Sequence, residues 1–157
     1  MKSDIILFAQ DLENKSNDIL MHNDKIVSNM QKLQELKLLT SEVPLKGKKI
    51  IDDKNIKVFL YKDKFSMVIP TNTNDKSGRE APILLYASIY DDKDLIKKNI
   101  DNFLKITTRT VDKNQILEII YSLYRVYKKE KNKKIIKILI SIAISLLLYL
   151  IVKYIKE

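Results

Sequence analysis

The longest apolar stretch of the chain is its C-terminal tail, residues 135–155. Only Lys137 and Lys153 carry charge there, one near each end, where an ammonium group can reach lipid headgroups while its stem stays in hydrocarbon. Twenty-one residues of helix reach about 31 Å, close to the ~30 Å hydrocarbon core of a bilayer. The pattern predicts one transmembrane helix. The alternative, a buried core helix, is disfavoured because so small a domain cannot surround a helix that is apolar on all sides.

Apolar residues near the N-terminus recur at every seventh position. They are Ile5, Leu12, Ile19, Ile26 and Leu33. This spacing predicts an amphipathic helix that is capped by Ser3 and ends by about Thr40, because Pro44 favours extended backbone before it. The helix would pack on its own domain or form a coiled coil with another copy or a partner. An edge strand over residues 5–9 is a third interpretation.

The middle of the chain alternates between apolar and polar residues, which is typical of β-structure. Residues 56–61 and 64–69 predict a hairpin with its turn at residues 62 and 63. Residues 82–90 are more apolar and predict a third strand, central in the sheet. The expected fold class is therefore α+β, with about three antiparallel strands between the N-terminal helix and further helices.

Two more helices are expected after the strands. The first begins at Asp91 and Asp92 and carries an apolar stripe before ending near residues 106–109. The stripe residues are Leu95, Ile96, Ile100, Phe103 and Leu104. From Asp112, a good N-cap, no Gly or Pro follows, so one helix can run from Lys113 into the membrane, or hinge at Asn132. The expected organisation is a cytosolic domain (1–110), a juxtamembrane helix (111–134) and a transmembrane helix (135–155).

Positive charge is concentrated just before the tail. Residues 125–137 hold seven basic residues against Glu130 alone, which is +6 of the formal net charge of +9. The lysines expected at the membrane interface are Lys128, Lys129, Lys131, Lys133, Lys134, Lys137 and Lys153. Anionic headgroups are the expected partner, and nucleic acid is not, because no nucleic-acid motif accompanies the charge. The positive-inside rule then places the N-terminal domain in the cytosol.

The sequence offers little for catalysis. It has no cysteine and a single histidine, His22, expected as an exposed helix residue. No phosphate-binding loop, metal motif or nucleophile elbow occurs. The acidic pairs at residues 52–53 and 91–92 are interpreted as caps or turns. We therefore expect no enzyme, no metal and no cofactor.

Two stretches are candidates for binding. Ser77, Gly78 and Arg79 join a flexible backbone to a guanidinium that can hold a phosphate or carboxylate of a small molecule or peptide; the alternative is a solvated loop. In the tail, polar or small residues form a slanted stripe suited to helix association and a homo-oligomer. Its members are Ser141, Ala143, Ser145 and Tyr149, with Lys137 and Lys153 at its ends. The alternatives are a pore lining and an inert anchor whose serines bond their own helix.

Two functions fit this layout. In the first, the cytosolic domain senses a ligand or partner and self-associating tails perturb the membrane. That layout resembles small single-pass effectors of bacterial antiviral defence systems, without any shared motif, and would place the protein in the bacterial inner membrane. In the second, the protein is a tail-anchored adaptor or tether that recruits a cytosolic partner. An enzyme tethered to lipid is the least favoured reading.

Overall fold

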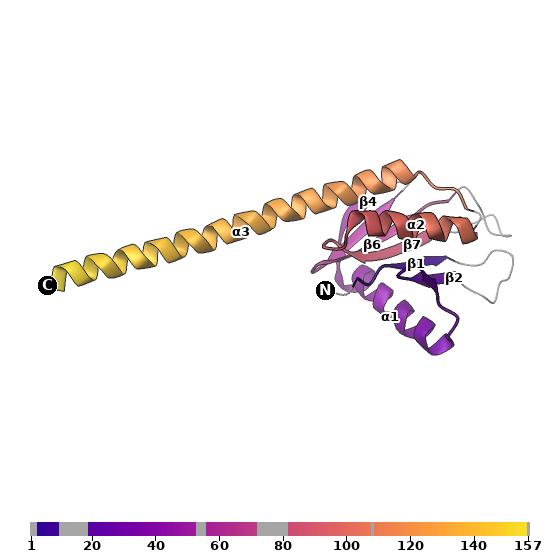
Figure 1. Cartoon of the computed structure of the whole chain (residues 1–157), viewed down its shortest axis with the longest axis horizontal. Coiled ribbons are helices and arrows are strands. Elements are labelled where there is room, and N and C mark those ends of the chain that lie inside the picture. Colours follow the sequence, from indigo (N-terminus) through magenta and orange to yellow (C-terminus); the bar gives the residue numbers. More distant parts are fainter. Residues whose placement is uncertain (1–2, 10–18, 53–55, 72–81, 108, 157) are drawn as a thin grey trace. The chain divides into compact units, whose positions relative to one another are not determined.

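The computed structural model describes residues 3–9, 19–52, 56–71, 82–107 and 109–156. Within these ranges the chain forms one seven-stranded antiparallel sheet and three helices (Figure 1). The α+β class and the long C-terminal helix expected from the sequence are confirmed. The expected count of about three strands is wrong. Two compact units follow one another along the chain, Met1–Ile120 and Tyr121–Glu157.

The strands follow the order β3-β2-β1-β7-β6-β5-β4 across the sheet. Their bounds are β1 Ile6–Ala9, β2 Ile19–His22, β3 Lys25–Ile26, β4 Lys48–Asp52, β5 Lys57–Tyr61, β6 Lys64–Ile69 and β7 Ile83–Ser88. The expected hairpin is β5 and β6, with Tyr61 opposite Lys64 across its turn. The expected central strand is β7, which has three strands on either side. These predictions are confirmed.

The helix expected from residue 3 to about residue 40 is wrong for most of its length. Ile5 precedes β1, Ile19 begins β2 and Ile26 ends β3, while Leu12 lies outside the described residues. Nor is β1 an edge strand, because it pairs with β2 on one side and β7 on the other. A strand that is paired and covered in this way is apolar almost throughout, so it does not alternate. The seven-residue spacing was therefore accidental.

Helix α1, Met30–Lys46, begins after β3. The side chain of Asn29 caps it by accepting the Lys32 N–H at 3.1 Å. The predicted end near Thr40 is wrong, because α1 continues through Pro44 to the residue before Gly47. Pro44 has no N–H to donate to the carbonyl one turn earlier, and α1 ends two residues after it. The residues after Thr40, which were predicted to lie outside the helix, thus supply the end of α1 and the start of β4.

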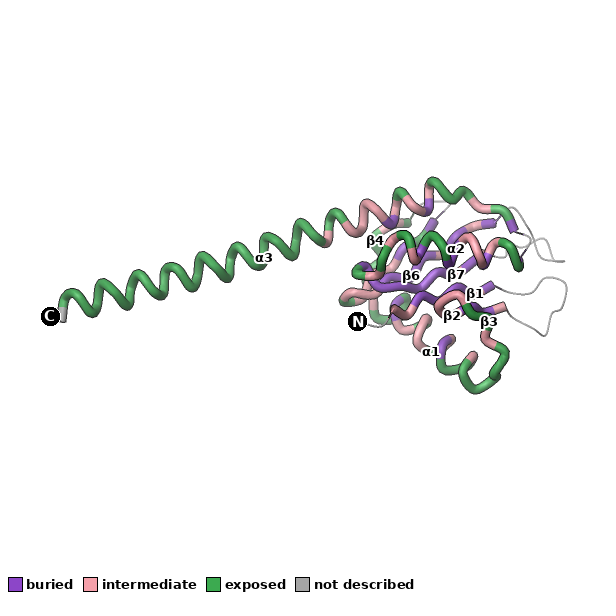
Figure 2. The backbone as a smooth tube through the Cα atoms, in the orientation of Figure 1, coloured by how far each residue is buried: buried purple, intermediate pink, exposed green. Residues whose placement is uncertain are grey.

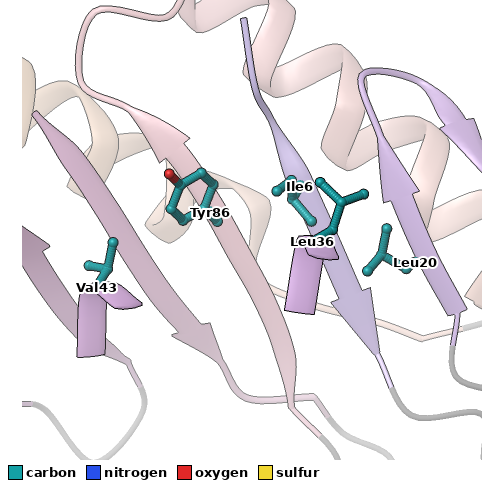
Figure 3. Packing of buried hydrophobic residues seen from close by; sticks show 5 residues of the cluster. All are labelled: Ile6, Leu20, Leu36, Val43 and Tyr86. Atoms are coloured by element: carbon teal, nitrogen blue, oxygen red, sulfur yellow. The ribbon is translucent and has the colours of Figure 1, made fainter. Parts of the chain in front are cut away.

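One face of the sheet packs against α1 (Figures 2 and 3). The cluster there joins three strands, β1, β2 and β7, to the helix through five buried residues, Ile6, Leu20, Leu36, Val43 and Tyr86. Each is at most 4 % exposed, so truncating one would remove apolar contacts and leave a cavity. Burial also raises the pKa of Tyr86 to about 12, because the phenolate would be poorly solvated.

Helix α2, Lys93–Thr107, lies over the opposite face from α1 (Figure 1). Ile96, Ile100 and Phe103 of its predicted stripe are buried, whereas Leu95 and Leu104 are half-buried. Asn99 is also buried on this face, which the apolar pattern did not indicate. The first turns of α3 complete the unit, with Ile116 and Ile120 buried.

Helix α3 runs from Lys113 to Lys156 as one element of 44 residues. The carboxylate of Asp112 accepts the Gln115 N–H at 3.0 Å, which confirms the predicted N-cap. Lys113 also forms an ion pair with Asp101 of α2 at 2.7 Å, which fixes the start of α3 on the first unit. No break occurs at Asn132.

Candidate functional site

The apolar half of α3 has no protein cover among the described residues. Every large apolar residue from Ile135 to Ile155 is between 45 % and 85 % exposed (Figure 2). Leaving so many aliphatic side chains in water would be unfavourable by roughly 25 cal/mol for each Å² of exposed apolar surface. Within the described residues, one helix is long and apolar enough to cross a membrane, and it is α3. It is consistent with a single-pass membrane protein.

Charged and aromatic side chains flank this apolar segment. Lys128 to Lys137 and Lys153, expected at the membrane interface, are all exposed on α3. Five of the eight tyrosines of the chain also lie in α3, three before the apolar segment and two within its last seven residues: Tyr121, Tyr124, Tyr127, Tyr149 and Tyr154. Tyrosine is enriched at both membrane–water interfaces because its ring is apolar and its hydroxyl is polar. The positions of these tyrosines could have been recognised from the sequence. The sequence analysis named only Tyr149, as a residue for helix association.

The proposed association stripe has one polar contact of its own. The Ser145 hydroxyl donates to the Ser141 carbonyl at 2.9 Å, one turn earlier in α3. A serine bonded in this way satisfies its donor without a second helix. Ser141, Ala143, Ser145 and Tyr149 are all exposed, so their role in association stays a prediction.

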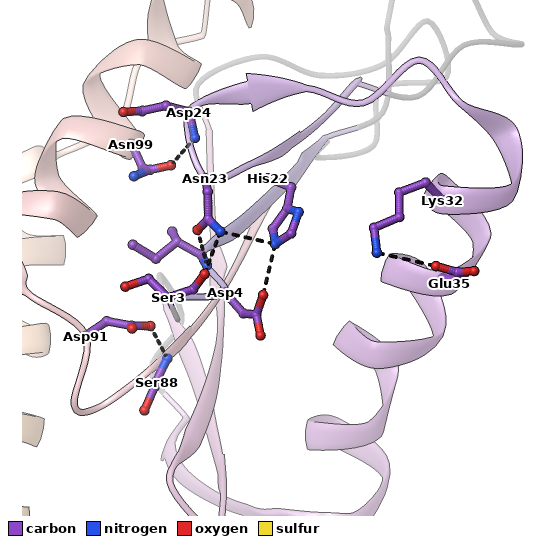
Figure 4. A network of polar contacts seen from close by, with 11 residues as sticks. Ser3, Asp4, His22, Asn23, Asp24, Lys32, Glu35, Ser88, Asp91 and Asn99 are labelled. Carbon is purple, nitrogen blue, oxygen red and sulfur yellow. Dashed lines mark hydrogen bonds and ion pairs between the residues drawn. The ribbon is translucent and has the colours of Figure 1, made fainter. Parts of the chain in front are cut away.

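A polar cluster joins the β2–β3 turn to α2 (Figure 4). Asn23 and Asp24 form the turn with φ angles of 46° and 66°, a left-handed conformation that Asn and Asp tolerate better than most residues. The Asp24 N–H donates to the side-chain oxygen of buried Asn99 at 2.8 Å. Asn99 in turn donates to the Leu95 carbonyl at 2.9 Å. The amide of Asn99 thereby holds the hairpin against the helix.

The carboxylate of Asp24 completes this cluster. Lys98 lies 3.0 Å from one of its oxygens, and Asn102 donates to the other at 3.0 Å. Burial alone would raise the pKa of Asp24, but the hydrogen bonds from Lys98 and Asn102 hold it below the usual value of 3.8. The folded state thus favours the ionised form. This stabilisation is present above pH 3.8 and is lost as the pH falls through the lower pKa of the folded protein.

Substituting Asn99 with Leu is expected to lower the free energy of unfolding by about 1–3 kcal/mol. The change keeps the number of side-chain heavy atoms but leaves the Asp24 N–H without its acceptor. The urea midpoint of the full chain in detergent, followed by tyrosine near-ultraviolet circular dichroism, measures the effect. The matched control is Lys97→Ala on the exposed face of the same helix, expected to shift stability by less than about 0.5 kcal/mol. Equal midpoints for the two variants would contradict the role given to Asn99.

The sequence predicted His22 as an exposed residue of a helix, and this prediction is wrong. His22 ends β2, its side chain is 22 % exposed, and its Nε2 lies 3.0 Å from an oxygen of Asp4. Next to it, the Asn23 side chain accepts the Ile5 N–H at 2.9 Å and donates to the Ser3 carbonyl (Figure 4). These contacts fasten the start of the chain to the β2–β3 turn. They are structural contacts, with Asp4 as the ionisable partner of His22.

Asp91 and Asp92 form a turn and a cap, as predicted, whereas Asp52 is the last residue of β4 and makes an ion pair. Asp92 accepts the Asp94 N–H at 2.7 Å at the start of α2, and Asp91 accepts the Ser88 N–H at 2.8 Å. Asp52 pairs with Lys49 in β4. In the described part of the chain, no group of three or more His, Asp or Glu side chains is placed to hold a metal ion.

The loop candidate cannot be placed in this fold. Ser77, Gly78 and Arg79 lie outside the described residues.

Comparison with known proteins gives no assignment. No protein-family model, no curated protein and no solved structure matches the chain.

Proposed function

We propose that this protein is a single-pass membrane tether whose N-terminal domain binds a cytosolic protein partner and holds it at the membrane surface. The observation that carries the proposal is the uncovered apolar half of α3. A helix that is apolar on all sides and not packed in protein is stabilised by lipid rather than by water.

The charges around the tail support a cytosolic domain. The lysine-rich segment, residues 128–137, precedes the span on the side of the domain, and the positive-inside rule keeps such segments in the cytosol. Anionic headgroups would attract each lysine near the surface by about 1 kcal/mol. Tyr127 and Tyr154 are 27 residues apart, about 40 Å along a helix, which matches a bilayer with its headgroup regions, so their rings would reach opposite interfaces.

A tether fits the tail better than a pore. Residues 138–152 contain no charge and only three polar side chains, Ser141, Ser145 and Tyr149. The Ser145 hydroxyl already donates within its own helix, which leaves little to line an aqueous path. The slanted stripe of these residues is what favours the second candidate, an effector whose associated tails permeabilise the membrane.

Exchanging the tail separates the two functions. Residues 135–155 are replaced by an unrelated Leu/Ala transmembrane helix of equal length, with the lysine-rich segment kept. Both proteins are reconstituted in dye-loaded vesicles that contain anionic lipid. The tether predicts no dye release above protein-free vesicles for either protein, and the same recovery of a cytosolic partner with both. Dye release that requires the native tail would favour the effector and overturn the tether.

A further inference from the structure

Helix α1 has a second apolar face that the sheet does not cover. Leu36 and Val43 on its inner face are 4 % and 1 % exposed, whereas Met30, Leu38 and Leu45 are 69 %, 72 % and 80 % exposed. At 3.6 residues per turn, these two sets point in roughly opposite directions. The outer set therefore cannot reach the sheet, and it forms what we call the outer stripe: Met30, Leu38 and Leu45.

Leu38 and Leu45 of the outer stripe have the spacing of a coiled-coil seam. Positions 31, 34, 38, 41 and 45 follow one another at intervals of three and four residues, as the a and d positions of two heptads do. Gln31, Leu38 and Leu45 then occupy a positions, and Gln34 and Ser41 occupy d positions. Two leucines and three polar residues make a weak seam, and polar residues in a seam restrict its register.

The charges beside the seam are complementary between two copies. Lys37 falls at a g position, and Glu35 and Glu42 fall at e positions. In a parallel pair, a g residue faces the e residue five positions later in the other helix, so Lys37 of each copy faces Glu42 of the other. An antiparallel pair would instead bring glutamates to glutamates and Lys37 to Lys37. The sequence of α1 thus favours a second copy in parallel.

Present contacts of these charges do not prevent that pairing. Glu42 lies 2.9 Å from Lys46, and both side chains are more than 40 % exposed. The ammonium of Lys37 lies 4.9 Å from the centre of the Phe8 ring. An ion pair between exposed side chains contributes only about 0.2–1 kcal/mol, so the Glu42–Lys46 pair exchanges readily. The half-buried Lys37 side chain must leave the Phe8 ring to meet Glu42 of the other copy.

We propose that the outer stripe of α1 is a docking surface for a second copy of this chain, packed in parallel with Leu38 and Leu45 facing their equivalents. Three exposed side chains per copy bury far less than the ~800 Å² per partner of a standard interface. Such a contact is too weak for free domains in dilute solution. Anchoring both copies in one bilayer raises their effective concentration, so the pair forms at the membrane. In this respect the inference rests on the proposed anchor.

Because the chain has no cysteine, single-cysteine variants test the proposal directly. Leu38→Cys, Leu45→Cys and the control Lys32→Cys, an exposed α1 position away from the seam, are reconstituted at low density in anionic vesicles and oxidised. Parallel packing predicts disulfide-linked dimers from both a-position variants and none from the control. Antiparallel packing would bring neither a position to its own equivalent. Flotation of the same vesicles reports whether the chain is anchored.

A charge exchange in the Leu45→Cys background tests the Lys37–Glu42 pairing through the cross-linked fraction. A general loss of folding could not explain recovery of that fraction in the double variant. Lys37→Glu or Glu42→Lys alone is expected to lower the cross-linked fraction roughly two- to fivefold, and the two together to restore it. Anchored protein without cross-links at either a position would overturn the inference and leave the tether intact. Protein that does not float with the vesicles would overturn both. Cross-links that the double exchange does not restore would overturn the parallel pairing.

Discussion

Replacing Ile144 and Leu147 together with lysine is expected to release the protein from the membrane. Residues 138–152 hold eleven Leu, Ile and Val side chains, which favour insertion by about 3–7 kcal/mol in total at 0.3–0.6 kcal/mol each. Two lysines near the centre of the span oppose it by about 5–7 kcal/mol and also remove two aliphatic side chains. One lysine would be tolerated on the same arithmetic. The measurement is the fraction of protein that stays with membranes after alkaline carbonate extraction.

The matched control moves the same two charges to the ends of the span. Ile135→Lys with Ile155→Lys adds equal charge, but ammonium groups there reach the headgroups, so the protein is expected to stay in the membrane fraction. Release by both pairs, or by neither, would contradict a span centred near residue 145.

Substituting Gly47 with Ala is expected to destabilise the domain by about 1–3 kcal/mol or more. A Cβ at this position would lie 2.3 Å from the Val43 carbonyl oxygen and 2.8 Å from that of Leu60. Both are backbone atoms, and the Gly47 N–H already donates to the first of them at 2.7 Å. Either the end of α1 or the start of β4 must therefore move to make room for the added Cβ.

The backbone conformation of Gly47 taken alone would suggest that Gly47→Ala stabilises the domain. Its φ of −87° and ψ of 166° suit any residue, so alanine would stabilise by about 0.4–1 kcal/mol through the unfolded chain alone. The steric contact is larger and decides the outcome. Thermal unfolding of the full chain in detergent measures it, with the exposed neighbour Lys48→Ala as control. A Gly47→Ala protein as stable as the control would show that the approach of the α1 end to Leu60 is not as close as described.

Local signals predicted the parts of this fold that depend on neighbours in sequence. The β5–β6 hairpin followed from alternation and a two-residue turn, in which Lys62 takes a φ of 55°. Strand β7 followed from its apolar run, and the tail from its length without charge. In each case one stretch of chain contains the whole pattern.

The prediction of a helix in the N-terminal region was wrong because the apolar pattern there has two explanations. An interior strand such as β1 and half a heptad repeat are both short apolar runs, and only pairing partners distinguish them. The Asn23-Asp24 turn was the available signal against a helix, since these residues favour turns with positive φ. Giving that dipeptide more weight than the spacing of Ile19 and Ile26 would have predicted the β2–β3 hairpin.

The polar cluster could not be predicted because its contacts span the chain. Asp24 and Asn99 are 75 residues apart, and neither lies in a recognisable motif. The outer stripe of α1 was hidden for a related reason. From the sequence, its leucines belong to one broadly apolar helix. Only the burial of each side chain distinguishes Leu36 and Val43, which are buried, from Leu38 and Leu45, which are exposed.

The most direct test of the account is the accessibility of single cysteines in sealed vesicles whose cytosolic face is outward. The variants are Lys62→Cys, in the exposed β5–β6 turn, and Leu147→Cys, in the span, in a chain with no other thiol. A membrane-impermeant maleimide is expected to label Lys62→Cys in intact vesicles, and Leu147→Cys only after the membrane is dissolved and the protein denatured. Equal labelling of both positions in intact vesicles would contradict a tail that lies within the bilayer.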